Sequence, residues 1–201
     1  MFTKLKKTIP ILLIGINLLE IILYAFNRDI VNEDMCRYIQ YTPYNKPGIF
    51  ALNYLELFYK PWRSIFNHRV ASRGITRLFK VFIKRPIDSI ELFGPIGGGC
   101  LILHKQGCVV LANKVGKNLT VAQGVTIGKG HKNSEGRDTP NIGDNVWICP
   151  NSVIFGGIDL GNNITVGAGT VLYKSVPNNC TVVGNPARIV KMNGDNCSIL
   201  L

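Results

Sequence analysis

The sequence predicts an all-β solenoid, a left-handed parallel β-helix, with an α-helical segment before it. An aliphatic residue recurs every six positions from Ile96 to Leu172, and a glycine or alanine often follows it. A short fixed period indicates a solenoid of stacked repeats. The first 90 residues instead carry apolar residues at three- and four-residue spacing, which is typical of helices.

The six-residue repeat fills most of the second half of the chain. Each unit gives one short strand and a corner, and three units close a triangular coil with the aliphatic residues stacked inside. A β-sandwich predicts alternation with period two, which is absent. We expect the β-helix over residues 91–192 and a tail over 193–201. The inward positions, with one extra residue before Val109 and a break before Ile142, are Ile96, Ile102, Val109, Val115, Val121, Ile127, Ile142, Ile148, Ile154, Leu160, Val166 and Leu172.

A polar stretch over residues 129–140 interrupts the repeat. Its composition, with Gly130 and Gly136, predicts a loop that projects from one corner of the coil. Loops on a rigid scaffold often carry function. A surface insertion without a role fits the same pattern.

Residues 1–90 form the predicted helical segment, and residues 8–26 are its most apolar part. As a helix this part would span roughly 28 Å, close to the thickness of a bilayer core. However, Glu20 near its middle is costly in lipid. Three lysines precede the stretch and Arg28 follows it. We therefore expect a helix in the interface at the inner face of a membrane, or one packed on the protein itself, rather than a transmembrane span.

Charge and cysteine usage exclude some classes of function. The net charge is +11, and a basic surface suits nucleic acid, anionic lipid or a phosphorylated cofactor. No dense run of Lys and Arg is interleaved with aromatic residues, so we expect no nucleic-acid partner. The six cysteines are scattered without metal-ligand spacing. This predicts buried apolar cysteines in a reducing compartment and no metal site.

The repeat carries several motifs in one order: HKQG ahead of VV, AQGVTIG, IGDNVWI, VGAGTVLYKSVP and VGNPARIV. With these motifs, residues 90–192 resemble the hexapeptide-repeat acyltransferases. They look most like the serine acetyltransferases and the O-acetyltransferases of bacterial capsule and exopolysaccharide synthesis. The resemblance implies an acyl-CoA-dependent enzyme that transfers acetyl, or another short acyl group, to a hydroxyl. It also implies a homotrimer, or a dimer of trimers, that binds CoA between subunits.

The resemblance assigns roles to six residues. His104 is the general base that takes the proton of the acceptor hydroxyl, which suits histidine because it exchanges protons near neutral pH. Serine acetyltransferases have an Asp fifteen residues before this His, and the chain has Ser89 at that position. Glu91 instead matches the acidic residue of the polysaccharide enzymes, and we expect it to orient His104. Gly124 lets the main chain approach the developing oxyanion. The CoA-binding positions are Ala168, Lys174 and Arg188.

Two departures from the serine acetyltransferases bear on the acceptor. Leu103 stands where those enzymes have an Asp just before the catalytic His, and Thr139 stands where they have a second His after the loop. Separately, His131 in the loop is a further candidate contact for CoA. Without an anion to pair with an ammonium group, we expect a sugar hydroxyl in capsule, exopolysaccharide or lipopolysaccharide biosynthesis as the acceptor. Serine O-acetylation in cysteine biosynthesis is the alternative, and a non-catalytic β-helix for trimerisation is a second one. Because acyl-CoA is cytosolic, we expect a cytoplasmic protein that contacts the inner face of the plasma membrane at most through residues 8–26.

Overall fold

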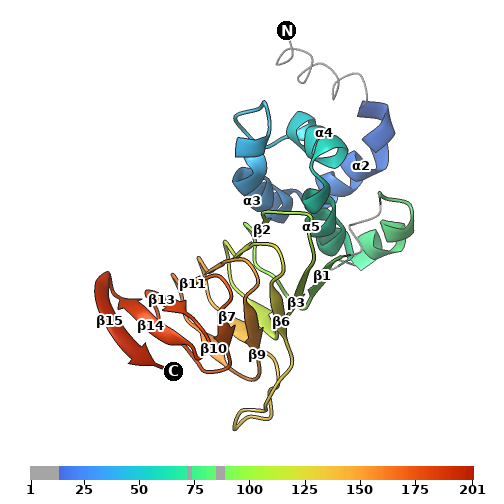
Figure 1. The fold of residues 1–201 in the computed structure, drawn as a ribbon. Coiled ribbons are helices and arrows are strands. Elements are labelled where there is room, and N and C mark those ends of the chain that lie inside the picture. Colours follow the sequence, from blue (N-terminus) through green and yellow to red (C-terminus); the bar gives the residue numbers. More distant parts are fainter. Residues whose placement is uncertain (1–13, 72–73, 85–88) are drawn as a thin grey trace. The chain divides into compact units, whose positions relative to one another are not determined.

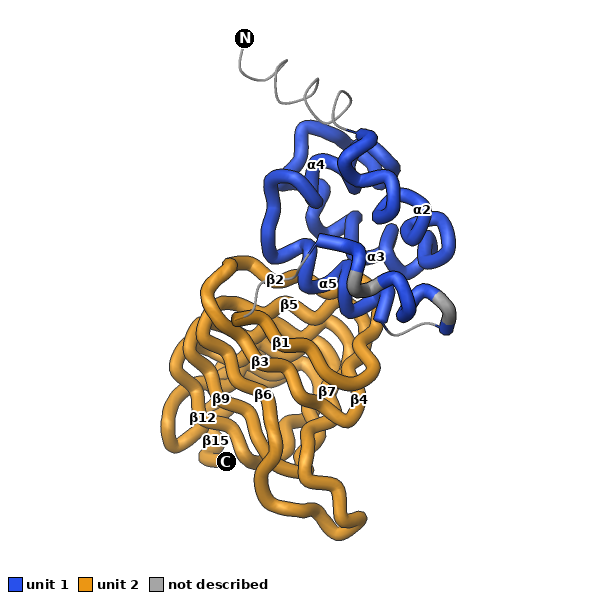
Figure 2. Tube along the Cα trace, turned by 90° about the vertical axis from the view of Figure 1, so that its right-hand side faces the viewer, with its two compact units in different colours: residues 1–87 blue, residues 88–201 orange. Residues whose placement is uncertain are grey.

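The computed structural model describes residues 14–71, 74–84 and 89–201. The chain divides into two compact units, residues 1–87 and residues 88–201 (Figure 2). The expected apolar helix over residues 8–26 is described from residue 14 onward, and residues 8–13 lie outside the described residues.

The first unit is helical, because the apolar residues of each segment recur at helical spacing and cover one face. Its core contains Tyr38, Trp62 and Phe66, which are buried. The rings of Tyr38 and Trp62 meet edge to face, with centroids 5.3 Å apart. Its elements are the 3-10 helices η1 (Ile14–Asn17), η2 (Ile39–Tyr41) and η3 (Gly74–Val81) and the α-helices α2 (Leu18–Phe26), α3 (Arg28–Tyr38), α4 (Ile49–Phe58) and α5 (Lys60–Ala71).

Two ionic contacts join distant parts of this unit. Arg69 donates from Nε and Nη2 to the two carboxylate oxygens of Asp34, at 2.7 and 2.8 Å, and both residues are buried. The backbone N–H of Lys84 donates to Oε1 of Glu20 at 3.2 Å, and its ammonium lies 3.6 Å from the same oxygen. Burial, together with the charge of Glu20, raises the pKa of Glu56 to about 8. Glu56 is therefore protonated at neutral pH and adds no second buried charge.

Glu20 belongs to α2 but points into the unit, where its side chain is almost fully buried. Helix α2 has nine residues, which is short for a bilayer core of about 30 Å. Across the described ranges of the chain, no helix combines the length and the apolar character that a membrane span requires.

The second unit is a parallel β-helix made of short strands (Figure 1). Its three sheets have the strand orders β1-β3-β6-β9-β12, β10-β7-β4 and β15-β14-β13-β11-β8-β5-β2, and neighbours that pair in parallel come from successive coils. All pairs are parallel except β13–β14 and β14–β15. The strands are β1 (Ile90–Phe93), β2 (Leu101–Ile102), β3 (Cys108–Leu111), β4 (Lys114–Val115), β5 (Thr120–Val121), β6 (Thr126–Gly128), β7 (Asn141–Ile142), β8 (Trp147–Ile148), β9 (Val153–Phe155), β10 (Asp159–Leu160), β11 (Thr165–Val166), β12 (Val171–Leu172), β13 (Cys180–Val183), β14 (Arg188–Met192) and β15 (Asp195–Leu200).

The aliphatic repeat residues stack inside the coil. Ile148 lies opposite Val121 on one side and Val166 on the other, and all three side chains are buried. The predicted phase is wrong at one position: Val110 points inward and is fully buried, whereas Val109 is only half-buried. Two extra residues precede this strand, rather than the one extra residue that the sequence suggested.

Asparagines stack at one series of corners of the coil. Asn118, Asn145, Asn163, Asn179 and Asn193 all have φ between +52° and +60°. Each side-chain amide donates to the Oδ1 of the next asparagine, at 2.9, 3.1, 2.8 and 3.2 Å in chain order. Asparagine tolerates the left-handed backbone better than other residues with a Cβ. The ladder therefore fixes the corner conformation and links successive coils.

The chain leaves the coil through an antiparallel hairpin. Strand β14 pairs with β13 of the last coil and with β15, so the expected tail over residues 193–201 contains a turn and all of β15. The hairpin closes one end of the seven-stranded sheet.

The asparagine ladder leads to a stability prediction. Asn163→Ala removes two ladder hydrogen bonds and places alanine at a left-handed backbone position, so we expect the free energy of unfolding to fall by about 2 kcal/mol. Asn163→Gly loses the same bonds, but glycine adopts the left-handed backbone conformation without strain. Its free energy of unfolding should therefore fall by about half as much. Urea unfolding followed by circular dichroism measures both variants. An alanine variant as stable as the wild type would show that the ladder does not stabilise the coil.

Candidate functional site

His104 lies on a corner that is wider than its equivalents. The inward residues Val121 and Ile127 are six positions apart in the chain, and the same spacing recurs in later coils. Ile102 and Val110, which occupy the same two places one coil earlier, are eight positions apart. Because the inward residues must stay in register, the two additional residues bulge outward. His104 is consequently exposed on the bulge, together with the two residues that follow it.

Hydrogen bonds fasten this corner to the chain on both sides. The hydroxyl of Ser89 donates to the backbone oxygen of Lys105 at 3.2 Å, and the N–H of Cys108 donates to the backbone oxygen of Ser89 at 2.8 Å. From the next coil, the N–H of Gly124 donates to the oxygen of Gly107 at 2.7 Å. The bulge is thus anchored on a rigid scaffold, as a precise site requires.

Glu91, the expected orienting acid, lies on β1. It pairs with Val109 on β3, the strand that follows the His104 corner, and its side chain is exposed. No hydrogen bond joins Glu91 to His104 within the part of the chain that the structure describes. Ser89, fifteen positions before His104, instead contacts the backbone just after His104.

Gly124 lies on the equivalent corner of the next coil, with φ +69°. A Cβ there would collide with the side chain of Asn151. The N–H of Gly124 is already bonded to Gly107, so its contribution to a site is the close approach of its main chain.

Sequence reasoning missed Gln123. It follows Val121 by two residues, as His104 follows Ile102, and Val121 and Ile102 are register partners. Its side-chain oxygen is buried and accepts no hydrogen bond from the described residues. A buried acceptor without a donor is costly. The only signal in the sequence was its place beside Gly124 in the AQGV motif.

The three predicted CoA-binding residues are all exposed, on different elements. Ala168 lies on the corner between β11 and β12, in the same series of corners as His104 and Gly124. Lys174 follows β12, with its ammonium 6.0 Å from the ring centroid of Tyr173. Arg188 begins β14 and donates to the hydroxyl of Ser198 at 2.9 Å. Ala168 thus shares a series of corners with His104, three coils further along, and the other two residues lie on other parts of the unit.

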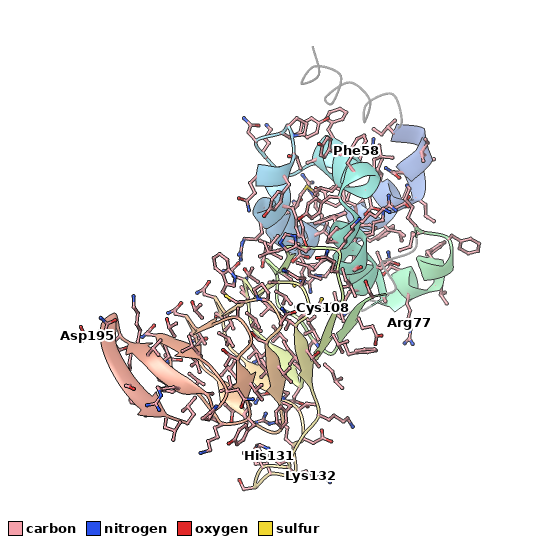
Figure 3. All side chains as sticks on the ribbon, viewed as in Figure 1. Phe58, Arg77, Cys108, His131, Lys132 and Asp195 are labelled. Carbon is pink, nitrogen blue, oxygen red and sulfur yellow. The ribbon has the colours of Figure 1, made fainter. Side chains whose placement is uncertain are left out.

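The loop over residues 129–140 projects from the coil and carries His131 (Figure 3). The imidazole of His131 lies against Gly156 so closely that a Cβ there would come within 2.7 Å of two ring atoms. Arg137 anchors the loop, donating from Nη1 to the oxygens of Thr139 and Ile158 at 2.7 and 2.9 Å. The loop is therefore a structured extension of the coil.

A thiolate and a bound metal ion are two further kinds of catalytic group. Burial raises the pKa of the Cys108 thiol to about 12, so this cysteine close to His104 in the chain is not a thiolate at neutral pH. No cluster of three or more His, Cys, Asp or Glu residues suited to a metal ion occurs in the described ranges.

Sequence similarity identifies bacterial relatives. The chain is 37% identical to a serine acetyltransferase of Staphylococcus epidermidis over 143 residues, which are 66% of this chain and 64% of that protein. A serine acetyltransferase of Staphylococcus aureus is 35% identical over the same length. The chain thus spans about 64% of the length of these curated relatives. No protein-family model matches the sequence.

Solved structures with a similar fold are also serine acetyltransferases. The crystal structure of Neisseria gonorrhoeae serine acetyltransferase matches with a TM-score of 0.62 and 26% identity, over 90% of this chain and 75% of that chain. Its complex with serine matches with a TM-score of 0.58 and 28% identity, over 83% and 70%. The relatives are serine acetyltransferases. In sequence and in fold the chain is thus similar to serine acetyltransferases, whereas a place in the capsule and exopolysaccharide branch stays a prediction.

Proposed function

We propose that this chain is an O-acetyltransferase that transfers an acetyl group from acetyl-CoA to a hydroxyl, with His104 as general base. The observation that carries the proposal is the widened corner, which exposes His104 on a scaffold similar to that of serine acetyltransferases. We also propose a left-handed coil and a homotrimer with CoA between subunits. Since acetyl-CoA is cytosolic, this enzyme acts in the cytoplasm.

The reaction needs one base and no covalent enzyme intermediate. The imidazole of His104 accepts the proton of the acceptor hydroxyl as the oxygen attacks the thioester carbonyl. The tetrahedral intermediate then expels the CoA thiolate, and the imidazolium returns the proton to sulfur. The products are an O-acetyl ester and CoA with a free thiol.

Neighbouring residues position the reactants. Glu91 orients the His104 imidazole and selects its tautomer once substrate draws the two together. The unpartnered side-chain oxygen of Gln123 accepts a hydrogen bond from an N–H or O–H of the bound substrate. This bond removes the free-energy cost of a buried acceptor without a donor. Gly124 allows close approach at the same corner series, and Lys174 and Arg188 bind the phosphates of CoA beside Ala168.

The names of the relatives favour serine as the acceptor over a sugar. A sugar hydroxyl is the second candidate, because the chain has Leu103 where a carboxylate would pair with the ammonium of serine. Both Nη atoms of Arg137 are also occupied, one by the backbone oxygen of Thr139 in the loop at 2.7 Å and the other by the carboxylate of Asp159 on β10 at 2.8 Å. Arg137 therefore offers little to the carboxylate of a free amino acid.

Removal of the base tests the mechanism. We expect His104→Ala to lower kcat by about 100-fold or more, because general-base catalysis contributes that much. Release of free thiol from acetyl-CoA measures the rate, and circular dichroism checks the fold. Lys114→Ala, an exposed change on the three-stranded sheet, is the control that should keep the wild-type rate. Full activity of the alanine variant would disprove the role of His104.

Acceptor preference is tested in the same assay. With L-serine and a panel of sugars at equal concentration, we expect the highest kcat/KM for serine. A preference for a sugar would move the assignment to the second candidate. If no hydroxyl compound increased thiol release above the rate in water, the proposed transferase activity itself would be contradicted.

A further inference from the structure

Among the described residues, one face of the helical unit exposes a group of apolar side chains. We name it the α2–α4 patch; its residues have exposed side chains and are Ile14, Ile16, Leu18, Ile22, Phe26, Ile49 and Phe50. Helices α2 and α4 lie side by side in both views (Figures 1 and 2). The side chain of Asn17, just before α2, donates to that of Asn53 on α4. The patch is therefore one surface, larger than scattered exposed apolar residues would give.

A cavity of about 480 Å³ opens within the patch. Ile14 and Ile21 line it from one side and Ile49 and Phe50 from the other, and Arg28 belongs to its wall. Hydrocarbon fits these walls, while the guanidinium of Arg28 suits an anionic group at the end of a hydrocarbon chain.

The exposed charges lie beside the patch, and none lies on η1 or α2. Glu20 is the only ionisable residue between positions 14 and 26 apart from Tyr24, and it is buried against Lys84. Exposed Arg28 and exposed Asp29 follow α2, and of these two Arg28 lines the cavity. Exposed Lys46 precedes the cavity residue Gly48 by two positions. Next to an apolar surface, cations such as Arg28 and Lys46 attract anionic lipid headgroups.

We propose that the α2–α4 patch docks the protein on the surface of an anionic lipid bilayer, without crossing it. The apolar residues enter the acyl boundary, and Arg28 and Lys46 bind headgroup phosphates. A second copy fits less well, because a symmetric contact would set Arg28 and Lys46 of two chains with net charge +11 against each other. The proposal is independent of the acetyltransferase activity.

Co-sedimentation of the full chain with phosphatidylcholine vesicles, with and without phosphatidylglycerol, tests the docking. We expect binding only when phosphatidylglycerol is present, and weaker binding as salt is raised. The double variant Ile22→Asn with Phe26→Asn should lower the bound fraction roughly tenfold or more, since it removes two apolar anchors. Leu200→Asn, an equally exposed apolar residue on β15 of the other unit, is the matched control and should bind as the wild type does.

Three outcomes would overturn the proposal. The first is that the wild type fails to sediment with anionic vesicles. The second is that the double variant sediments as well as the wild type. The third is that no vesicles are bound and light scattering shows self-association of the wild type that the double variant has lost. The last outcome would assign the patch to a second copy of the chain. Circular dichroism of the double variant, in which only exposed side chains change, checks that a loss of binding is not a loss of folding.

Discussion

Each strand of the β-helix hydrogen-bonds to the strand at the same position in the next coil, and this register constrains the rest of the unit. The N–H of Thr120 donates to the oxygen of Val146, and the N–H of Trp147 to that of Ile164, both at 2.8 Å. Because the pairing is parallel, equivalent residues stack: aliphatic side chains inside and asparagines along one corner series. A coil cannot absorb an extra residue in its interior, so any insertion must bulge outward.

The candidate chemistry lies where the repeat is broken. The corner with His104 holds two additional residues, and the loop over residues 129–140 is a longer insertion with His131. Both insertions are held by hydrogen bonds, through Ser89 in the first case and Arg137 in the second. Regular coils therefore supply rigidity, and the insertions supply groups that solvent and substrate can reach.

Much of this arrangement could be predicted from the sequence, because a six-residue period depends only on local spacing. The period could not decide which of the adjacent residues Val109 and Val110 points inward, since that depends on how the preceding corner folds. Nor could it show that Glu20 is satisfied, because its partner Lys84 lies 64 positions away in the chain. Gln123 escaped notice for a similar reason: a buried oxygen without a donor is a property of packing.

Deletion of Lys105 and Gln106 tests most directly whether the widened corner creates the active site. The deletion restores the six-residue spacing of the other coils, so the thermal unfolding midpoint should stay within a few degrees of the wild type. Thiol release from acetyl-CoA with the preferred acceptor should fall to background, because His104 is drawn into a regular corner. A folded deletion variant that keeps the wild-type rate would contradict the assignment of the site to this corner.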